Sequence, residues 1–391
     1  MKVYLDYSAT TPVKPEVFNA MTPYLRDYYG NPSSLHSYGR ENKKAIDTAR
    51  DQIAQTLKAK PEEVFFTGGG SEADNWAIKG TAEALKNKGR HIITTSIEHH
   101  AVLHTCQHLE KQGYEVTYLP VNEEGIISVE ELKSHLREDT ILITIMYANN
   151  EIGTIQPIQE IATIAKEHKI LFHTDAVQAY GHLEINTQDL PVDMISISAH
   201  KLYGPKGVGA LYIRKGTRIH NLIHGGAQER KKRAGTENIA GIVGFGKAAE
   251  LAYSQLSEHV AHLTELRDYL LKGIQQTIPY TKLNGHREKR LPNNVNVSFE
   301  FIEGESMLLS LDMVGIAASS GSACTSGSLD PSHVLLSLGL SHEMAHGSLR
   351  LTLGDQNTKE EIDYVLEQLP PIVQRLRDMS PLYENLKEGA R

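Results

Sequence analysis

Cysteine is scarce in this sequence, and positive charge is not in excess. Only two cysteines, Cys106 and Cys324, occur among 391 residues. That is too few for a disulfide framework, so a reducing cytoplasm is the expected compartment. Lysine and arginine number 40 against 48 aspartates and glutamates, which gives a formal net charge of −8. The sequence therefore offers no global electrostatic attraction for nucleic acid.

Long apolar runs are missing as well. No uninterrupted stretch approaches the ~20 residues that a helix needs to cross a bilayer, and residues 1–6 lack the apolar core of a signal peptide. Short basic runs at residues 230–233 and 287–290 are interpreted as solvated loop surfaces. We expect a cytoplasmic globular protein with no membrane partner and no direct nucleic-acid partner.

The order of apolar segments predicts an α/β fold. β-branched runs alternate with helical patterns through the first two thirds of the chain; at residues 74–86, for example, Ile78, Ala82 and Leu85 recur at helical spacing. Strands that are buried on both faces and separated by helices indicate a mostly parallel, seven-stranded sheet flanked by helices. The expected strands cover residues 64–67, 91–95, 116–119, 141–147, 171–174, 194–198 and 210–213, and further helices cover 101–111 and 158–168.

The pattern changes in the last third of the chain. A long helical region over about 239–276 leads to residues 294–299, where apolar and polar residues alternate. This change predicts a second, smaller α+β domain, which the extended N-terminal segment joins. The expected domains are a large one over residues 15–255 and a small one formed by residues 1–14 and 256–391.

Polar residues follow two of the predicted strands, where open α/β sheets bind ligands. Residues 68–74, Gly-Gly-Gly-Ser-Glu-Ala-Asp, open a helix, and free amides at such a position favour phosphate. The alternative is a turn in which Ser71 caps the helix and Asp74 completes a capping box. Asp175 ends another strand and can pair with a protonated ring nitrogen, as pyridoxal phosphate requires, or it can simply cap a helix. Gln178 can donate to a neighbouring oxygen.

A lysine follows a third strand. Lys201, flanked by Ser198 and His200, can form a Schiff base once desolvation favours its neutral amine, and the two neighbours can hold a phosphate. An arbitrary lysine is more often a solvated surface residue. The order of phosphate loop, carboxylate and lysine favours one pyridoxal-phosphate site, because each segment supplies a different part of it.

A run of small polar residues, 319–328, surrounds Cys324. The run lacks the bulk to pack in a core, so a mobile surface loop is expected. A thiol in such a loop becomes a reactive thiolate if a cationic group lies near it. On its own, an incidental loop cysteine is the simpler interpretation.

Histidine and arginine side chains complete the candidate site. His99 follows a predicted strand and can stack on a cofactor ring and move protons. With His100, His104 and Cys106 it could in principle ligate zinc, but no second ligand pair of recognisable spacing is present, so no metal is expected. Arg350 offers a bidentate fork for a substrate carboxylate, or it pairs with a surface acid.

Together these segments resemble the cysteine desulfurases of the NifS and IscS type, which are pyridoxal-phosphate enzymes of fold type I. The similarity runs from residues 5–12 to Arg350, and the Ser-Ala-His-Lys and Ser-Ser-Gly-Ser-Ala-Cys-Thr-Ser segments are its most specific motifs. Ser71 stands where relatives often have threonine, and serine can donate the same hydrogen bond. The resemblance implies a homodimer that converts L-cysteine to L-alanine and passes the sulfur, as a persulfide on Cys324, to an acceptor or Fe–S scaffold protein.

The resemblance also implies a role for each matching residue. Lys201 would carry the cofactor and remove the substrate Cα proton, His99 would stack on the ring and transfer protons, and Cys324 would accept sulfur. Asn150 and Arg350 would bind the substrate carboxylate. The residues implied to bind pyridoxal 5'-phosphate are Gly70, Ser71, Asp175, Gln178, Ser198, His200, Lys201 and, from the other subunit, Thr236.

Two other functions fit part of the sequence. A selenocysteine lyase, or another fold-type I lyase or aminotransferase, would use Lys201, but an aminotransferase would need no thiol in the 319–328 run. A non-catalytic sulfur carrier would keep Cys324 but would need no Schiff-base lysine. Because both residues are present, a cysteine desulfurase is favoured.

Overall fold

A seven-stranded sheet is the centre of the molecule. The computed structural model describes residues 1–320 and 331–384, and its main sheet has the order β2-β8-β7-β6-β5-β3-β4. The pairs from β7 to β4 are parallel, whereas β8 runs antiparallel to both of its neighbours. The predicted mostly parallel α/β sheet is confirmed. The strands are β2 (Val64–Thr67), β3 (His91–Thr95), β4 (Glu115–Leu119), β5 (Thr140–Thr144), β6 (Leu171–Asp175), β7 (Met194–Ser198) and β8 (Gly209–Ile213).

Helices cover both faces of this sheet. Successive side chains of a strand point to opposite faces: Ile92 packs in one apolar cluster with α3 and α4, whereas Ile93 packs in another with α2, α6 and α8. Every residue of β3, β5, β7 and β8 is buried for this reason. The helices and 3-10 turns of this part are α1 (Pro15–Arg26), α2 (Ser37–Thr56), η1 (Pro61–Glu63), α3 (Gly70–Leu85), α4 (His100–Glu110), α5 (Val129–Ser134), α6 (Ile158–Glu167), η2 (Ala199–Lys201), α7 (Gln228–Lys231) and α8 (Ile239–Ser254).

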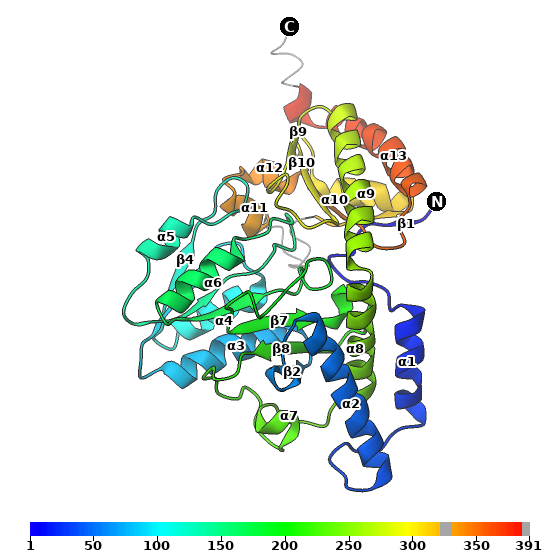
Figure 1. The fold of residues 1–391 in the computed structure, drawn as a ribbon. Coiled ribbons are helices and arrows are strands. Elements are labelled where there is room, and N and C mark those ends of the chain that lie inside the picture. The colour runs from blue at the N-terminus through cyan, green and yellow to red at the C-terminus, as the bar shows by residue number, and fades with distance from the viewer. Residues whose placement is uncertain (321–330, 385–391) are drawn as a thin grey trace.

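A second layer of structure packs beyond α8, in the upper part of Figure 1. Its sheet has the antiparallel order β12-β10-β9, and β1 pairs in parallel with β11. Val3 and Leu5 of the N-terminal segment share an apolar cluster with residues from 263 to 373. The elements are β1 (Val3–Tyr4), α9 (Leu256–Thr277), β9 (Thr281–Leu283), β10 (Asn294–Phe299), α10 (Gly304–Met313), β11 (Ile316–Ala317), α11 (His333–Ser337), α12 (His342–His346), β12 (Ser348–Thr352) and α13 (Lys359–Asp378).

Three expected elements differ from the structure. The helix expected over 74–86 begins earlier, at Gly70. The helical region over 239–276 is two helices, α8 and α9, which run end to end and are separated at Gln255 (Figure 1). The expected strand over 141–147 ends at Thr144; beyond it the Met146 N–H donates to the buried Glu98 carboxylate, at 2.9 and 3.1 Å. Within the described ranges, no helix has both the length and the apolar content to span a membrane.

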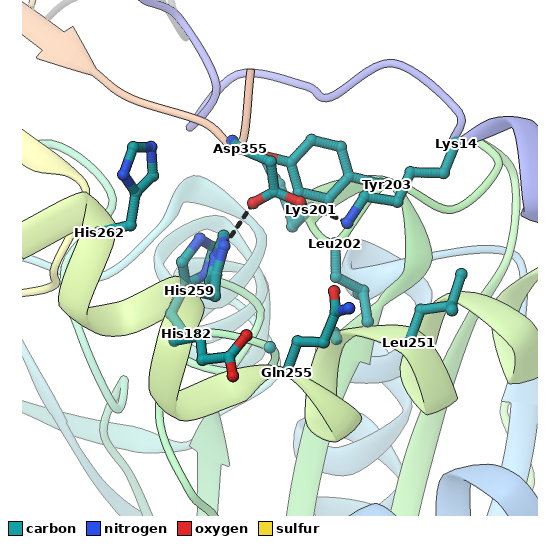
Figure 2. A pocket seen from close by; sticks show the side chains of 13 residues that line it. Lys14, His182, Lys201, Leu202, Tyr203, Leu251, Gln255, His259, His262 and Asp355 are labelled. Atoms are coloured by element: carbon teal, nitrogen blue, oxygen red, sulfur yellow. Dashed lines mark hydrogen bonds and ion pairs between the residues drawn. The ribbon is translucent and has the colours of Figure 1, made fainter. Parts of the chain in front are cut away.

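Asp355 binds residues from three separate segments of the chain, namely Lys14, Tyr203 and His259. Its carboxylate forms ion pairs with Nζ of Lys14 and Nδ1 of His259, and its N–H donates to the Tyr203 hydroxyl at 2.6 Å. These residues line a cavity of about 260 Å³ that also reaches Lys201 (Figure 2). Burial raises the pKa of Asp355, but the hydrogen bond and charge of His259, together with Lys14, outweigh burial and lower the pKa.

We expect the substitution Asp355→Asn to destabilise the protein at neutral pH. Because the folded-state pKa is lowered, the carboxylate stabilises the fold above its unfolded pKa of about 3.9, and this contribution is lost as pH falls through the folded pKa. Loss of a partly buried pair costs ~1–3 kcal/mol. At about pH 7, D355N should unfold at a lower temperature than the wild type. The difference between their thermal midpoints should narrow only in strong acid. Asp27→Asn, which removes an exposed pair with Arg26, is the control; equal midpoints for D355N and wild type would contradict the prediction.

Candidate active site

The start of α3 lies against the ends of β6 and β7. Gly69, with φ of 153°, is the N-cap of this 16-residue helix. A Cβ on Gly70 would lie 2.7 Å from Cγ2 of Val177 and 3.7 Å from Cβ of Ser198, so only glycine permits the close approach. The free amides of the first helical turn therefore lie beside Ser198 and form a cradle suited to phosphate. The alternative in which Ser71 caps the helix is wrong, because the helix already begins at Gly70.

Asp175 supplies a buried carboxyl group at the end of β6. It is 7% exposed, and its Oδ1 accepts a hydrogen bond from Val177 N–H at 2.9 Å. Burial raises the pKa of Asp175 to about 6, although that hydrogen bond and the charge of Lys201 lower it. A second carboxyl, Asp74 of α3, is 1% exposed, and burial together with Asp175 raises its pKa. Two buried carboxyls favour a cationic ligand such as a protonated ring nitrogen.

A neutral polar network lies around Asp74. Nε2 of His173 is 3.7 Å from Asp74 Oδ1 and 2.9 Å from Ser196 Oγ, and Nδ1 of His173 is 2.8 Å from Thr144 Oγ1. Burial lowers the pKa of His173 to about 3, so the ring brings no positive charge. From the sequence, Asp74 is expected only as a possible cap; the apolar neighbours Ala73 and Ala77, which are buried on the same helix, are the signal that it faces inward.

The N-terminal segment crosses the site and contacts three predicted residues. Nζ of Lys201 donates to the Ala9 carbonyl at 2.8 Å and also to the Ser8 carbonyl. Nε2 of Gln178 donates to the same Ser8 oxygen at 3.0 Å, and Nδ1 of His200 is 3.2 Å from the Thr10 hydroxyl. Residues 8–10 therefore form a wall of the site that sequence analysis did not identify.

His99 is neutral in this environment. It caps α4, and its Nδ1 accepts a hydrogen bond from Ala101 N–H at 3.1 Å. Burial, with the charge of Lys201, lowers the pKa of His99 to about 4. Because Nδ1 is the acceptor, the single ring proton is assigned to Nε2, where it can be donated.

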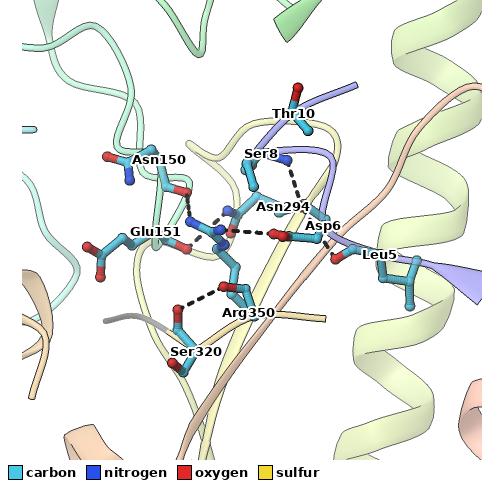
Figure 3. A network of polar contacts seen from close by, with 12 residues as sticks. Leu5, Asp6, Ser8, Thr10, Asn150, Glu151, Asn294, Ser320 and Arg350 are labelled. Atoms are coloured by element: carbon cyan, nitrogen blue, oxygen red, sulfur yellow. Dashed lines mark hydrogen bonds and ion pairs between the residues drawn. The ribbon is translucent and has the colours of Figure 1, made fainter. Parts of the chain in front are cut away.

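Arg350 of β12 and Asn150 lie together in the site. The Arg350 side chain is almost completely buried, and its Nη1 donates to the Asn150 carbonyl at 3.2 Å. Its Nη2 donates to Oδ1 of Asp6 at 3.0 Å (Figure 3). The predicted pair is therefore brought together through the Asn150 main chain, with Asp6 as an additional partner that sequence analysis missed.

Two predicted residues are not brought into the group. Cys324 lies outside the described residues, so its position is not assigned. Thr236 is exposed, and within residues 1–320 and 331–384 no hydrogen bond joins it to the other predicted site residues. Its segment lies near α3 because Arg233 pairs with Glu72 at 2.8 Å.

The histidines that raised the question of zinc are near one another. The ring centroids of His100 and His104 are 4.9 Å apart, and His333 lies 4.8 Å from His100. In the described part of the chain, however, no group of three or more His, Cys, Asp or Glu residues is arranged to hold a metal ion. Cys106 is buried, and burial raises the pKa of its thiol.

Comparison with known proteins agrees with this geometry. Residues 3–365 match the family model described as aminotransferase class-V. "Cysteine desulfurase IscS" of Clostridium botulinum is 61% identical over 98% of this chain and 97% of its own length. The protein of that name from Methanosarcina thermophila is 61% identical over 97% and 94%. A solved "NIFS-LIKE PROTEIN" aligns with a TM-score of 0.91 and 42% identity over 96% of this chain and all of its own.

A further solved structure, described as SspA in complex with cysteine, has a TM-score of 0.80 and 41% identity over 90% of this chain and 99% of that one. The fold and the lysine-centred site define a class-V aminotransferase, a fold-type I enzyme. The chain belongs to that family and, within it, to the cysteine desulfurases of the IscS and NifS type.

We expect the ring of His99 to remain neutral throughout the physiological range. With a pKa of about 4, against about 6.5 for an unperturbed histidine, the ring gains a proton only in acid. Histidine-selective NMR of the wild type, with His99→Asn used to assign the signal, should show constant His99 shifts between about pH 5.5 and 8. A titration midpoint near 6.5 would reject the assignment.

Proposed function

We propose that this chain is a pyridoxal-phosphate-dependent cysteine desulfurase, which converts L-cysteine to L-alanine and transfers the sulfur, as an enzyme persulfide, to acceptors for Fe–S cluster assembly or other thio-cofactors. The observation that carries the proposal is the convergence of the Lys201 amine, the Asp175 carboxyl and the α3 cradle at one edge of the sheet. Membership of the family implies the same cofactor.

The residues present fit pyridoxal 5'-phosphate. A doubly charged phosphate matches the open α3 amides beside Gly70, and a protonated ring nitrogen matches the buried Asp175. Bound there, the cofactor supplies an electron sink for the carbanion formed at the substrate Cα. We propose that Gly70, Ser71, Ser198 and His200 hold the phosphate, that Asp175 and Gln178 contact the ring, and that Lys201 is the covalent anchor.

The chain's own side chains then have separate tasks. Arg350 and Asn150 bind the substrate carboxylate and orient the Cα–H bond toward Lys201, which moves the proton as a neutral amine. His99 packs on the ring and offers the proton on Nε2. The Cys324 thiolate attacks the substrate sulfur; the substrate C–S bond breaks, an S–S bond forms on Cys324, and the carbon fragment gains protons to become alanine.

We also propose a shared site in a homodimer. Thr236 would reach the phosphate bound by the other subunit; its exposed side chain supports this role.

We further propose that the chain is divided into a large domain over residues 15–255 and a small domain of residues 1–14 and 256–391. The helix break at Gln255, and the apolar cluster that unites Val3 and Leu5 with residues 263–373, support the division.

The decisive experiment compares Cys324→Ser with wild type. Serine is a near-isostere but a far weaker nucleophile at neutral pH, so alanine formation from L-cysteine should fall by ~10²-fold or more and no protein persulfide should form. Cofactor absorbance should be unchanged. The matched control is Cys106→Ala, which removes the other, fully buried thiol and should retain activity. Near wild-type alanine and sulfide production by C324S would indicate a lyase that forms no covalent sulfur intermediate.

We expect cofactor affinity to depend on the charge of Asp175. Below its pKa of about 6 the carboxyl is protonated and no longer pairs with the ring nitrogen. The cofactor-free chain should therefore bind pyridoxal phosphate more weakly as pH falls from about 8 to about 5. Asp175→Asn, which carries no charge at either pH, should bind weakly and show a flatter profile in fluorescence titrations. A parallel pH profile in both proteins would mean that Asp175 does not form the pair.

A further inference from the structure

One N–H group of the Arg350 guanidinium has no hydrogen-bond partner among the described residues. Arg350 lies in β12, opposite Asn296 of β10. Its Nη2 is bound to Asp6 and its Nη1 to the Asn150 carbonyl. Its Nε is buried and has no hydrogen-bond partner in the described part of the chain. A buried, unsatisfied N–H of a cation is costly, so this edge of the guanidinium is suited to a further acceptor.

Asp6 is held rigidly, because the residues around it pair with β12. Thr352 N–H donates to the Leu5 carbonyl at 2.8 Å, and Tyr7 N–H donates to the Thr352 carbonyl at 3.3 Å. Ser8 N–H donates to the Thr352 hydroxyl at 2.9 Å. The backbone of Asp6 is therefore fixed two residues along the strand from Arg350, and its carboxylate has a defined position relative to the guanidinium.

No other carboxylate takes the place of Asp6 among the described contacts of Arg350. Glu151 lies close enough for Arg350 to lower its pKa, yet burial raises that pKa to about 7, and its carboxyl binds the Ser332 hydroxyl instead. Asp6 is 22% exposed in its side chain and Arg350 only 2%. The guanidinium is thus held by the Asp6 carboxylate at Nη2 and by the Asn150 carbonyl at Nη1, and Asp6 is the charged partner of the two (Figure 3).

We propose that Asp6 is a positioning residue for recognition of the substrate carboxylate. By binding Nη2 from the N-terminal segment, it holds the guanidinium in one orientation and leaves Nε, which has no partner among the described residues, to bind the substrate carboxylate. This inference rests on the proposed function, in which Arg350 receives the carboxylate of cysteine. It makes residues 5–8 part of the substrate site rather than only part of the fold.

The test combines a protein change with a substrate change. For Asp6→Asn, KM for L-cysteine should rise ~10-fold or more with kcat changed less than ~3-fold, because a misplaced guanidinium weakens binding of the carboxylate. L-Cysteinamide lacks the carboxylate, so its kcat/KM should be nearly equal in D6N and wild type. Asp6→Glu keeps the charge but moves the carboxylate by about one bond length; a positioning role predicts that Glu does not restore KM. Asp27→Asn is the control for loss of an exposed carboxylate.

A binding measurement separates this inference from the proposed function. Calorimetry of holoenzyme with L-alanine and with L-alaninamide requires no turnover, and D6N should lose affinity for L-alanine only. Equal losses for both ligands, an unchanged KM, or full rescue by Asp6→Glu would overturn the positioning role. Failure of the proposed function would instead be seen in the wild type, as absence of alanine formation from cysteine.

Discussion

The carboxyl group of Asp175 lies buried at the end of β6, where ionisation is unfavourable unless a cation comes close. The buried groups next to Asp175 do not supply such a cation. Asp74 cannot neutralise Asp175, because it is itself a buried acid, and His173 is held neutral by burial. Lys201 is the nearby positive group that acts on the Asp175 pKa. The site is therefore electrostatically prepared for a ligand that carries a positive charge on one side and a phosphate on the other.

The sheet topology brings these groups together. β6 and β7 are parallel neighbours, so Asp175 and the segment from Ser198 to Lys201 emerge at the same edge. Gly70 lets the start of α3 approach that edge closely. The second layer then adds Arg350 from β12, and the N-terminal segment lies between the two layers (Figure 1). The candidate site thus depends on contacts between distant parts of the chain.

Features that depend on local sequence could be predicted, whereas features that depend on contacts between distant parts of the chain could not. Strands β2, β3, β7 and β10 begin and end at the expected residues, because dense β-branched or alternating runs are bounded by polar residues. The helical pattern over 239–276 did not indicate a break at Gln255, since helical spacing continues on both sides of it, although the expected domain boundary falls at the same residue. Asp74 and Asp6 were also missed. An aspartate at a helix start is usually a cap, and Asp6 acquires its partner only from a residue 344 positions away.

The N-terminal segment contacts both ends of the space that an amino acid would occupy. At Asp6 it holds the guanidinium of Arg350, and at Ser8 and Ala9 its carbonyls hold the amine of Lys201. The two groups that would meet the carboxylate and the amino nitrogen of a substrate are thus attached to one short turn, in which the Ala9 N–H donates to the Asp6 carbonyl at 3.0 Å. Because Asp6, Ser8 and Ala9 belong to the same turn, a displacement of this turn would move both groups together.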